Sequence, residues 1–297
     1  MASNNMRFTR AALLVVAIAF LIYNIYQAII TTMIVSHFPL IVKNLPNFIQ
    51  STNPQLQLTL FLTQEVAGST GEYMRLIGAI FALISAILFY RKKSGYLNML
   101  SKALLFESLY FLLYIPVVIN HFVGSVISTS SFLNFNVGLS YLLQIVLIFP
   151  SLFILSRKLK KGSNLYWMFV AATFYVFGMW IRHGFLWVYG IFPMQTQLTL
   201  IDMVGSVNSL LTLLLAAIIC GAACLMIKTS SARAQMRTWL LSLAVVLAGT
   251  YFVIYDVISI FSPIYNAYLL LTDAWMITLL LLGIALFYDY RKQAIPI

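Results

Sequence analysis

The ionisable side chains inside long apolar runs are the residues of this sequence best suited to chemistry. A charge in hydrocarbon is costly, so such residues commonly mark solute paths, proton relays or ion pairs. The candidates expected in the outer half of the membrane are Glu72, Arg75, Arg182, Asp256 and Asp273. They predict an outward-facing polar chamber or, alternatively, ion pairs that neutralise charges near the interface and fix helix register.

The sequence also indicates how these charges could pair. Glu72 and Arg75 are three residues apart, which places them one turn apart on the same helix face. Arg182 belongs to a different apolar run from Asp256 and Asp273, and we expect it to pair with one of them. Glu107 differs from these residues, because it falls toward the inner end of its run.

Two histidines in separate apolar runs allow a further hypothesis. His121 and His183 are expected at a similar depth on different helices, and neither is adjacent to acidic residues that would build a cage for a hard metal ion. Neutral imidazoles on two helices can ligate a b-type haem. Two histidines alone carry little specificity for haem, so the sequence leaves the cofactor open and indicates no metal site.

Sequence signatures of catalysis are missing from this chain. It has no glycine-rich phosphate loop, no GxSxG elbow, no HExxH helix and no CxxC pair. Cys220 and Cys224 are four residues apart within one apolar run and are best interpreted as small packing residues. Whether the chain is an enzyme therefore stays uncertain, and activity of the chain by itself is not expected.

The composition indicates that membrane-spanning segments position these residues. Of the 297 residues, 62% are hydrophobic and 8% are charged, whereas soluble domains carry about 25% charged residues. The net charge of +11 comes from cations in short links between apolar runs, which is typical of membrane proteins. A soluble domain and a nucleic-acid partner are both excluded by this pattern.

The apolar runs predict an all-α, polytopic integral membrane bundle of about eight transmembrane helices arranged as helical hairpins. An apolar helix needs about 20 residues to cross a bilayer. The expected spans, which form a single domain over 1–297, are 11–35, 72–90, 103–123, 137–155, 166–192, 202–227, 238–261 and 265–288. The longest link, His37 to Gly71, is rich in polar residues.

The positions of the Lys and Arg residues predict the orientation of the bundle. With a cytoplasmic N-terminus, the inner side holds all but Lys43, Arg75 and Arg182 of the 18 cations. Cytoplasmic loops of membrane proteins carry such an excess. We therefore expect both termini in the cytoplasm and the chain in the plasma membrane of a prokaryotic cell.

The sequence supports two hypotheses about function. The first is a non-catalytic integral membrane subunit that anchors or scaffolds a larger membrane complex, for instance a respiratory or electron-transfer assembly. Many apolar helices and few reactive groups favour it, and its partners are the lipid bilayer and other subunits. The alternative is a transporter or channel that moves a small solute or protons through the outer polar chamber.

Overall fold

A computed structural model describes most of the first 185 residues and parts of the remainder. The described residues are 6–37, 39, 54–127, 131–160, 165–185, 211, 214–219, 221–222, 239–240, 242–247, 249–251, 253 and 278–293. Regular secondary structure in these ranges is helical, and none of them contains a β-strand. The predicted all-α class is therefore confirmed for the described part of the chain.

The described helices form a bundle. They are α1 (Arg7–Ser36), α3 (Pro54–Tyr90), α4 (Tyr96–Leu112), α5 (Ile115–Ile127), α6 (Ser131–Lys160), α7 (Leu165–Phe185) and α11 (Thr278–Gln293). The stretches long and apolar enough to cross a membrane are Arg7–Ser36, Leu58–Tyr90, Tyr96–Val126 and Phe135–Leu159. The total of eight spans stays a prediction, since most of 202–277 lies outside the described residues.

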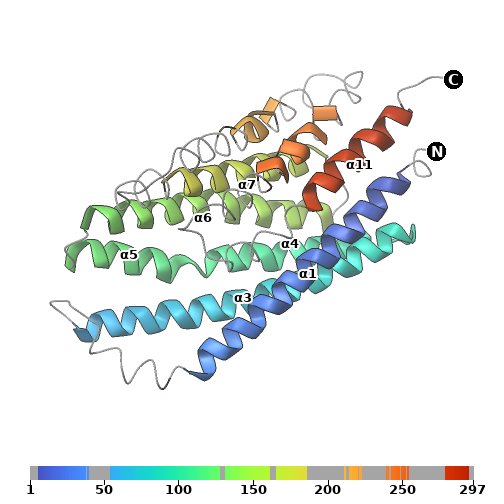
Figure 1. The fold of residues 1–297 in the computed structure, drawn as a ribbon. Helices are drawn as coiled ribbons and strands as arrows, with labels where there is room; N and C mark the ends of the chain where they lie inside the picture. Colours follow the sequence, from blue (N-terminus) through green and yellow to red (C-terminus); the bar gives the residue numbers. More distant parts are fainter. Residues whose placement is uncertain are drawn as a thin grey trace.

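The helices pack mainly against their neighbours in the chain. Helix α3 contacts α1, α4 and α5, and α6 contacts α4, α5 and α7. Helix α11 instead packs on α1, and this contact brings the start of the chain close to its end. Figure 1 shows both termini at the same end of the bundle.

Helix α3 is much longer than the span expected from the sequence. It begins at Pro54 rather than near Glu72, so the second half of the expected His37–Gly71 link is helical. Proline is favoured in the first turn of a helix, where its missing N–H costs nothing. Polar side chains in this segment find hydrogen-bond partners within the helix. The hydroxyl of Thr59, for example, donates to the carbonyl of Gln55 at 2.9 Å.

The expected span 103–123 is divided between two helices. Helix α4 ends at Leu112, and α5 begins at Ile115 and continues in the same direction (Figure 1). Pro116 explains the break, because it has no N–H to donate to the carbonyl of Leu112 and its ring would clash with that carbonyl in a continuous helix; proline is tolerated in the first turn, where α5 has it. The break places Tyr114 in the short turn between the two helices.

The helix ends that carry the positive links meet at one end of the bundle. The Arg10 guanidinium, near the start of α1, lies 5.4 Å from the ring centroid of Phe89, near the end of α3. The Ser101 hydroxyl, near the start of α4, donates to the carbonyl of Ser156 in α6 at 2.6 Å. We call this region the basic end. That it faces the cytoplasm remains a prediction.

The two terminal helices are joined at the basic end by a buried hydrogen bond. The backbone N–H of Thr9 donates to Oδ2 of Asp289 in α11 at 2.7 Å. Met6, which precedes α1, provides no side-chain cap. Asp289 is only 2% exposed, and its carboxylate takes over the role of an N-terminal cap, favoured by the positive end of the helix dipole.

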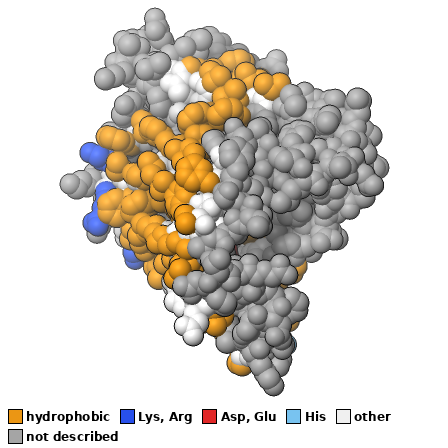
Figure 2. Space-filling view, turned by 90° about the vertical axis from the view of Figure 1, so that its left-hand side faces the viewer, with side chains coloured by type: hydrophobic (Ala, Val, Ile, Leu, Met, Phe, Trp, Pro, Cys, Tyr) orange, Lys and Arg blue, Asp and Glu red, His pale blue; other side chains and the backbone are white. Residues whose placement is uncertain are grey.

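The described outer surface is largely apolar. Exposed side chains include Ile22 and Met33 of α1 and Val66 of α3, each at least 60% accessible. Figure 2 shows hydrophobic side chains gathered into a broad face with Lys and Arg side chains at its margin. A face of this kind is what a helix bundle presents to lipid, where every backbone polar group must be paired within the protein.

Candidate functional site

A polar cavity lies among helices α1, α3, α4, α5 and α6. Its volume is about 230 Å³. The residues that line it are Thr31, Ile34, Gln64, Glu65, Ala67, Gly68, Ser69, Gly71, Glu72, Tyr110, Leu113, Tyr114, Val117 and Tyr141. Carboxylate, amide and hydroxyl groups therefore line a space between helices that include ones long enough to cross a membrane. We call this space the α3 cavity.

Helix α3 provides most of the polar wall because its polar residues recur at helical spacing. Glu65, Ser69 and Glu72 follow one another by four and three residues, which places them along one face of the helix. Gly68 lies on the same wall, and a Cβ built there meets no atom within 4 Å. The absence of a side chain at Gly68 thus leaves the cavity open.

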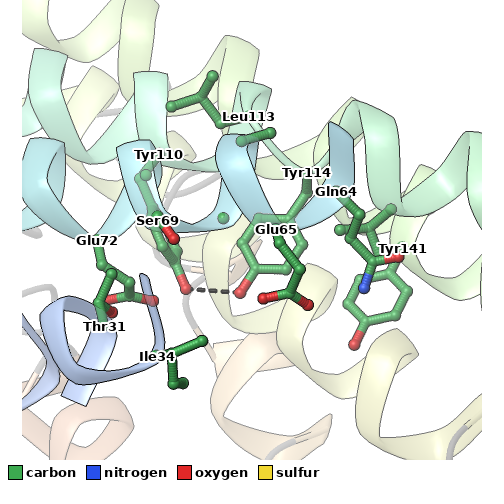
Figure 3. Close-up of a pocket in the computed structure, with 14 residues that line it drawn as sticks. Thr31, Ile34, Gln64, Glu65, Ser69, Glu72, Tyr110, Leu113, Tyr114 and Tyr141 are labelled. Atoms are coloured by element: carbon green, nitrogen blue, oxygen red, sulfur yellow. Dashed lines mark hydrogen bonds between the residues drawn. The ribbon is translucent and has the colours of Figure 1, made fainter. Parts of the chain in front are cut away.

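Two tyrosines form the opposite wall. The hydroxyls of Tyr110 and Tyr114 are 2.7 Å apart and share a hydrogen bond. In the view of Figure 3, this hydroxyl pair lies between the carboxylates of Glu72 and Glu65. Two turns of helix, about 10 Å, separate these two acids along α3.

Arg75 lies next to the cavity and is deeply buried. Its Nε is 3.3 Å from Oε1 of Glu107 in α4, and the two side chains are 8% and 14% exposed. The guanidinium also lies over three rings, 4.6 Å from the centroid of Tyr110, 5.5 Å from Phe20 and 5.6 Å from Tyr23. Guanidinium–ring contacts of this kind are favourable, and more so when water is excluded. Arg75 is therefore held by groups from α1 and α4.

This geometry differs from the pairing expected on α3. The ion pair that the structure shows for Arg75 is with Glu107, a residue of another helix, rather than with Glu72. Glu72 and Arg75 also lie near the middle of α3, and not at the end of a span, because the helix begins at Pro54. Glu72 remains within electrostatic range of Arg75 and Glu107.

The structure does not describe the side chains of the other residues expected in the chamber, Arg182, Asp256 and Asp273. The backbone of Arg182 and His183 belongs to α7, but their side chains fall outside what the structure describes. Asp256 and Asp273 lie outside the described residues altogether. Their proposed pairing with Arg182 stays a prediction.

His121 lies beside the cavity wall. Its ring stacks on Tyr141 at a centroid distance of 5.8 Å and an interplanar angle of 16°. Tyr141 stacks in turn on Tyr114 at 5.6 Å. The neighbouring Asn120 donates a hydrogen bond from its amide to the side-chain oxygen of Gln64. His121 thus supports an aromatic column, and haem ligation together with His183 stays a hypothesis.

Several cavity residues were not recognised as candidates from the sequence. Glu65, Gln64 and Ser69 belong to the expected His37–Gly71 link, and Tyr110 and Tyr114 carry no charge that would mark them within an apolar run. A signal was present: Glu65 and Glu72 are seven residues apart, with small residues between them. That spacing indicates one face of a continuous helix with room beside it.

Comparison of the chain with protein-family models, with curated proteins and with solved structures finds no match. The chemistry of the α3 cavity therefore has to be argued from its own residues. Its lining offers carboxylate, amide and hydroxyl oxygens, the groups that bind water, protons and hard cations.

Proposed function

We propose that this protein is an integral membrane transporter or channel that admits a small solute or protons through the α3 cavity. The observation that supports the proposal is the presence of Glu65 and Glu72 in the wall of a cavity inside an apolar helix bundle. Acidic residues at such positions are expensive, and ion and proton pathways are their usual reason.

The position of the cavity supports entry from the side opposite the basic end. Thr31 and Ile34 line it from the last turns of α1, which ends at Ser36. Gln64 and Glu65 line it from the first half of α3, which ends at the basic end. If the basic end faces the cytoplasm, the cavity opens toward the exterior.

A cavity-filling variant tests this proposal. The Cβ that Gly68→Leu adds meets no atom within 4 Å, so the substitution adds volume at the cavity wall without a clash at the Cβ, and replacing glycine within a helix is favourable by about 1 kcal/mol. We expect flux of protons or small cations into liposomes to fall to background. Val66→Leu is the matched control, because Val66 points outward at 61% exposure.

The anchoring role is the alternative proposal. The apolar surface in Figure 2 could be covered by partner helices as well as by lipid. Co-purification of the protein in mild detergent separates the two. An anchor should purify with other subunits, and its assembly should be equal in Gly68→Leu and Val66→Leu. Flux by the solitary protein, lost only in Gly68→Leu, supports the transporter and contradicts a purely structural role.

A further inference from the structure

The charges around the α3 cavity do not balance. Arg75 is the only cation among the described residues in or next to it, and this guanidinium is paired with Glu107. Glu72 and Glu65 both line the cavity and have no cation of their own there. With every carboxylate ionised, a low-dielectric region would hold an excess of negative charge, which is unfavourable unless a positive charge enters.

Arg75 is poorly placed to neutralise Glu72 in addition. Its guanidinium is fixed by the 3.3 Å contact to Glu107 and by the rings of Phe20, Tyr23 and Tyr110. Moving it toward Glu72 would leave Glu107 buried and unpaired, a loss that is large for a buried ion pair. Among the described residues no other cation is close to Glu72, so the cavity is where a compensating charge would enter.

One carboxylate oxygen of Glu72 is buried and unsatisfied. Oε2 has essentially no accessible surface and no hydrogen-bond partner among the residues that the structure describes. An ionised carboxylate in this state loses the solvation of that oxygen without compensation. A proton on the carboxyl group removes the charge and supplies an O–H donor.

We propose that Glu72 is the proton-binding residue of the α3 cavity, an inference that rests on the proposed transport function and specifies its coupling ion. A proton delivered by a hydronium ion forms an O–H bond on the Glu72 carboxylate and leaves a water molecule in the cavity. Release reverses the step, so no other reactant is required. Arg75 and Glu107 serve as a fixed ion pair that positions Glu72 next to the Tyr110 hydroxyl.

The groups around Glu72 are consistent with this role. Its own helix contributes Glu65 and Arg75, and α4 contributes Glu107 and Tyr110. In the described part of the chain, the other titratable or polar groups that line the cavity, lie beside its wall or face Arg75 come from five helices and one turn. They are Tyr23 and Thr31 of α1, Gln64 and Ser69 of α3, Tyr114 of the α4–α5 turn, His121 of α5, Tyr141 of α6 and Tyr175 of α7. The hydroxyl groups pass protons or bind water, and His121 stacks on Tyr141 without being part of the cavity lining.

Infrared difference spectroscopy during a pH titration tests the proposal on the purified protein in liposomes. The wild type should show a carboxylic-acid C=O stretching band that disappears as the pH rises. Glu72→Gln, which mimics the protonated form, should lack this band, whereas the matched variant Glu65→Gln should retain it. A band that survives in Glu72→Gln, or that disappears only in Glu65→Gln, overturns the assignment.

Thermal unfolding provides a second measurement that does not depend on transport. Ionisation of Glu72 should lower the melting temperature of the wild type as the pH rises, and Glu72→Gln should remove that decrease. If instead sodium or potassium raises the melting temperature of the wild type but not of Glu72→Gln, the bound charge is a metal cation and the proton proposal is wrong. Absence of flux with an intact Glu72 band would refute the transport function alone.

Discussion

The basic end and the α3 cavity both contain charged residues, but cations predominate at the first and carboxylates at the second among the described residues. At the basic end cations are in excess, and the described ones lie on rings or at helix ends, as Lys102 does over Phe81 and Arg157 over Phe153. In and beside the cavity the described carboxylates outnumber the described cations, and Arg75 is paired with Glu107.

This difference shows which charged residues are explained by their position in the bundle alone. At a membrane boundary, long cationic side chains pack their stems on apolar groups and keep their charge in water and headgroups. Such residues need no further role. In the middle of an apolar helix the same explanation is not available. Glu72, one of whose oxygens is buried without a hydrogen-bond partner in the described part of the chain, is therefore a candidate for binding a ligand.

The largest effect is expected from breaking the buried pair beside the cavity. Arg75→Met leaves Glu107 buried without its cation, and loss of one partner of a buried pair costs about 3–5 kcal/mol. We expect a correspondingly lower free energy of unfolding, measured by chemical denaturation in detergent micelles. The double variant Arg75→Met/Glu107→Met should recover most of the loss, because apolar side chains of similar volume need no partner.

The comparison between the two regions depends on this result. If Arg75→Met costs no more than a surface substitution such as Lys93→Met at the basic end, then Arg75 is solvated and the cavity has no buried charge to balance. A double variant as unstable as the single one would mean that the two residues contribute through packing rather than through their charges.

An intermediate effect is expected at the basic end. Asp289→Ala removes the carboxylate that accepts the N–H of Thr9, and leaving that buried donor without a partner costs about 1–3 kcal/mol. Asp289→Asn retains an acceptor oxygen and should lose less. Both losses should appear in thermal unfolding, while flux per folded molecule should match the wild type. Reduced flux in Asp289→Ala would show that the two regions are coupled.

The class of fold could be predicted from the sequence, since apolar runs of about 20 residues separated by basic links define a membrane bundle. The start of α3 could not, because Gln55, Thr59 and Thr63 appear as a polar link in the sequence. In the structure the Thr59 and Thr63 hydroxyls each donate to the carbonyl four residues earlier, which lets them remain helical. Local bonding of this kind leaves no trace in hydropathy.

The partner of Arg75 was also beyond the sequence. Glu72 is one turn away on the same helix, and helical spacing alone favours that pair. The structure brings Glu107 to Arg75 from α4 through the packing of α3 on α4, where Gly71 and Gly78 allow close approach. A contact between residues 32 positions apart depends on how helices pack, and one sequence does not specify it.

The smallest effect on stability, and the most specific one on function, is expected from Tyr114→Phe. The substitution removes one hydroxyl of the hydrogen-bonded pair Tyr110–Tyr114 in the cavity wall, at a cost of about 0.5–1.5 kcal/mol. Tyr73→Phe is the matched control, because its hydroxyl also has a partner at 2.8 Å, Thr32 Oγ1, yet lies outside the cavity lining.

Each tyrosine variant therefore loses one hydroxyl–hydroxyl hydrogen bond, and the two should differ in proton flux. If protons reach Glu72 along the hydroxyl pair, Tyr114→Phe slows flux in liposomes while the carboxylic-acid band of Glu72 still titrates at equilibrium, since the relay changes a rate and not the proton affinity. Equal flux in Tyr114→Phe and Tyr73→Phe would mean that water in the cavity carries the proton to Glu72 directly. Loss of the Glu72 band in Tyr114→Phe would instead assign the hydroxyl pair to the proton-binding site itself.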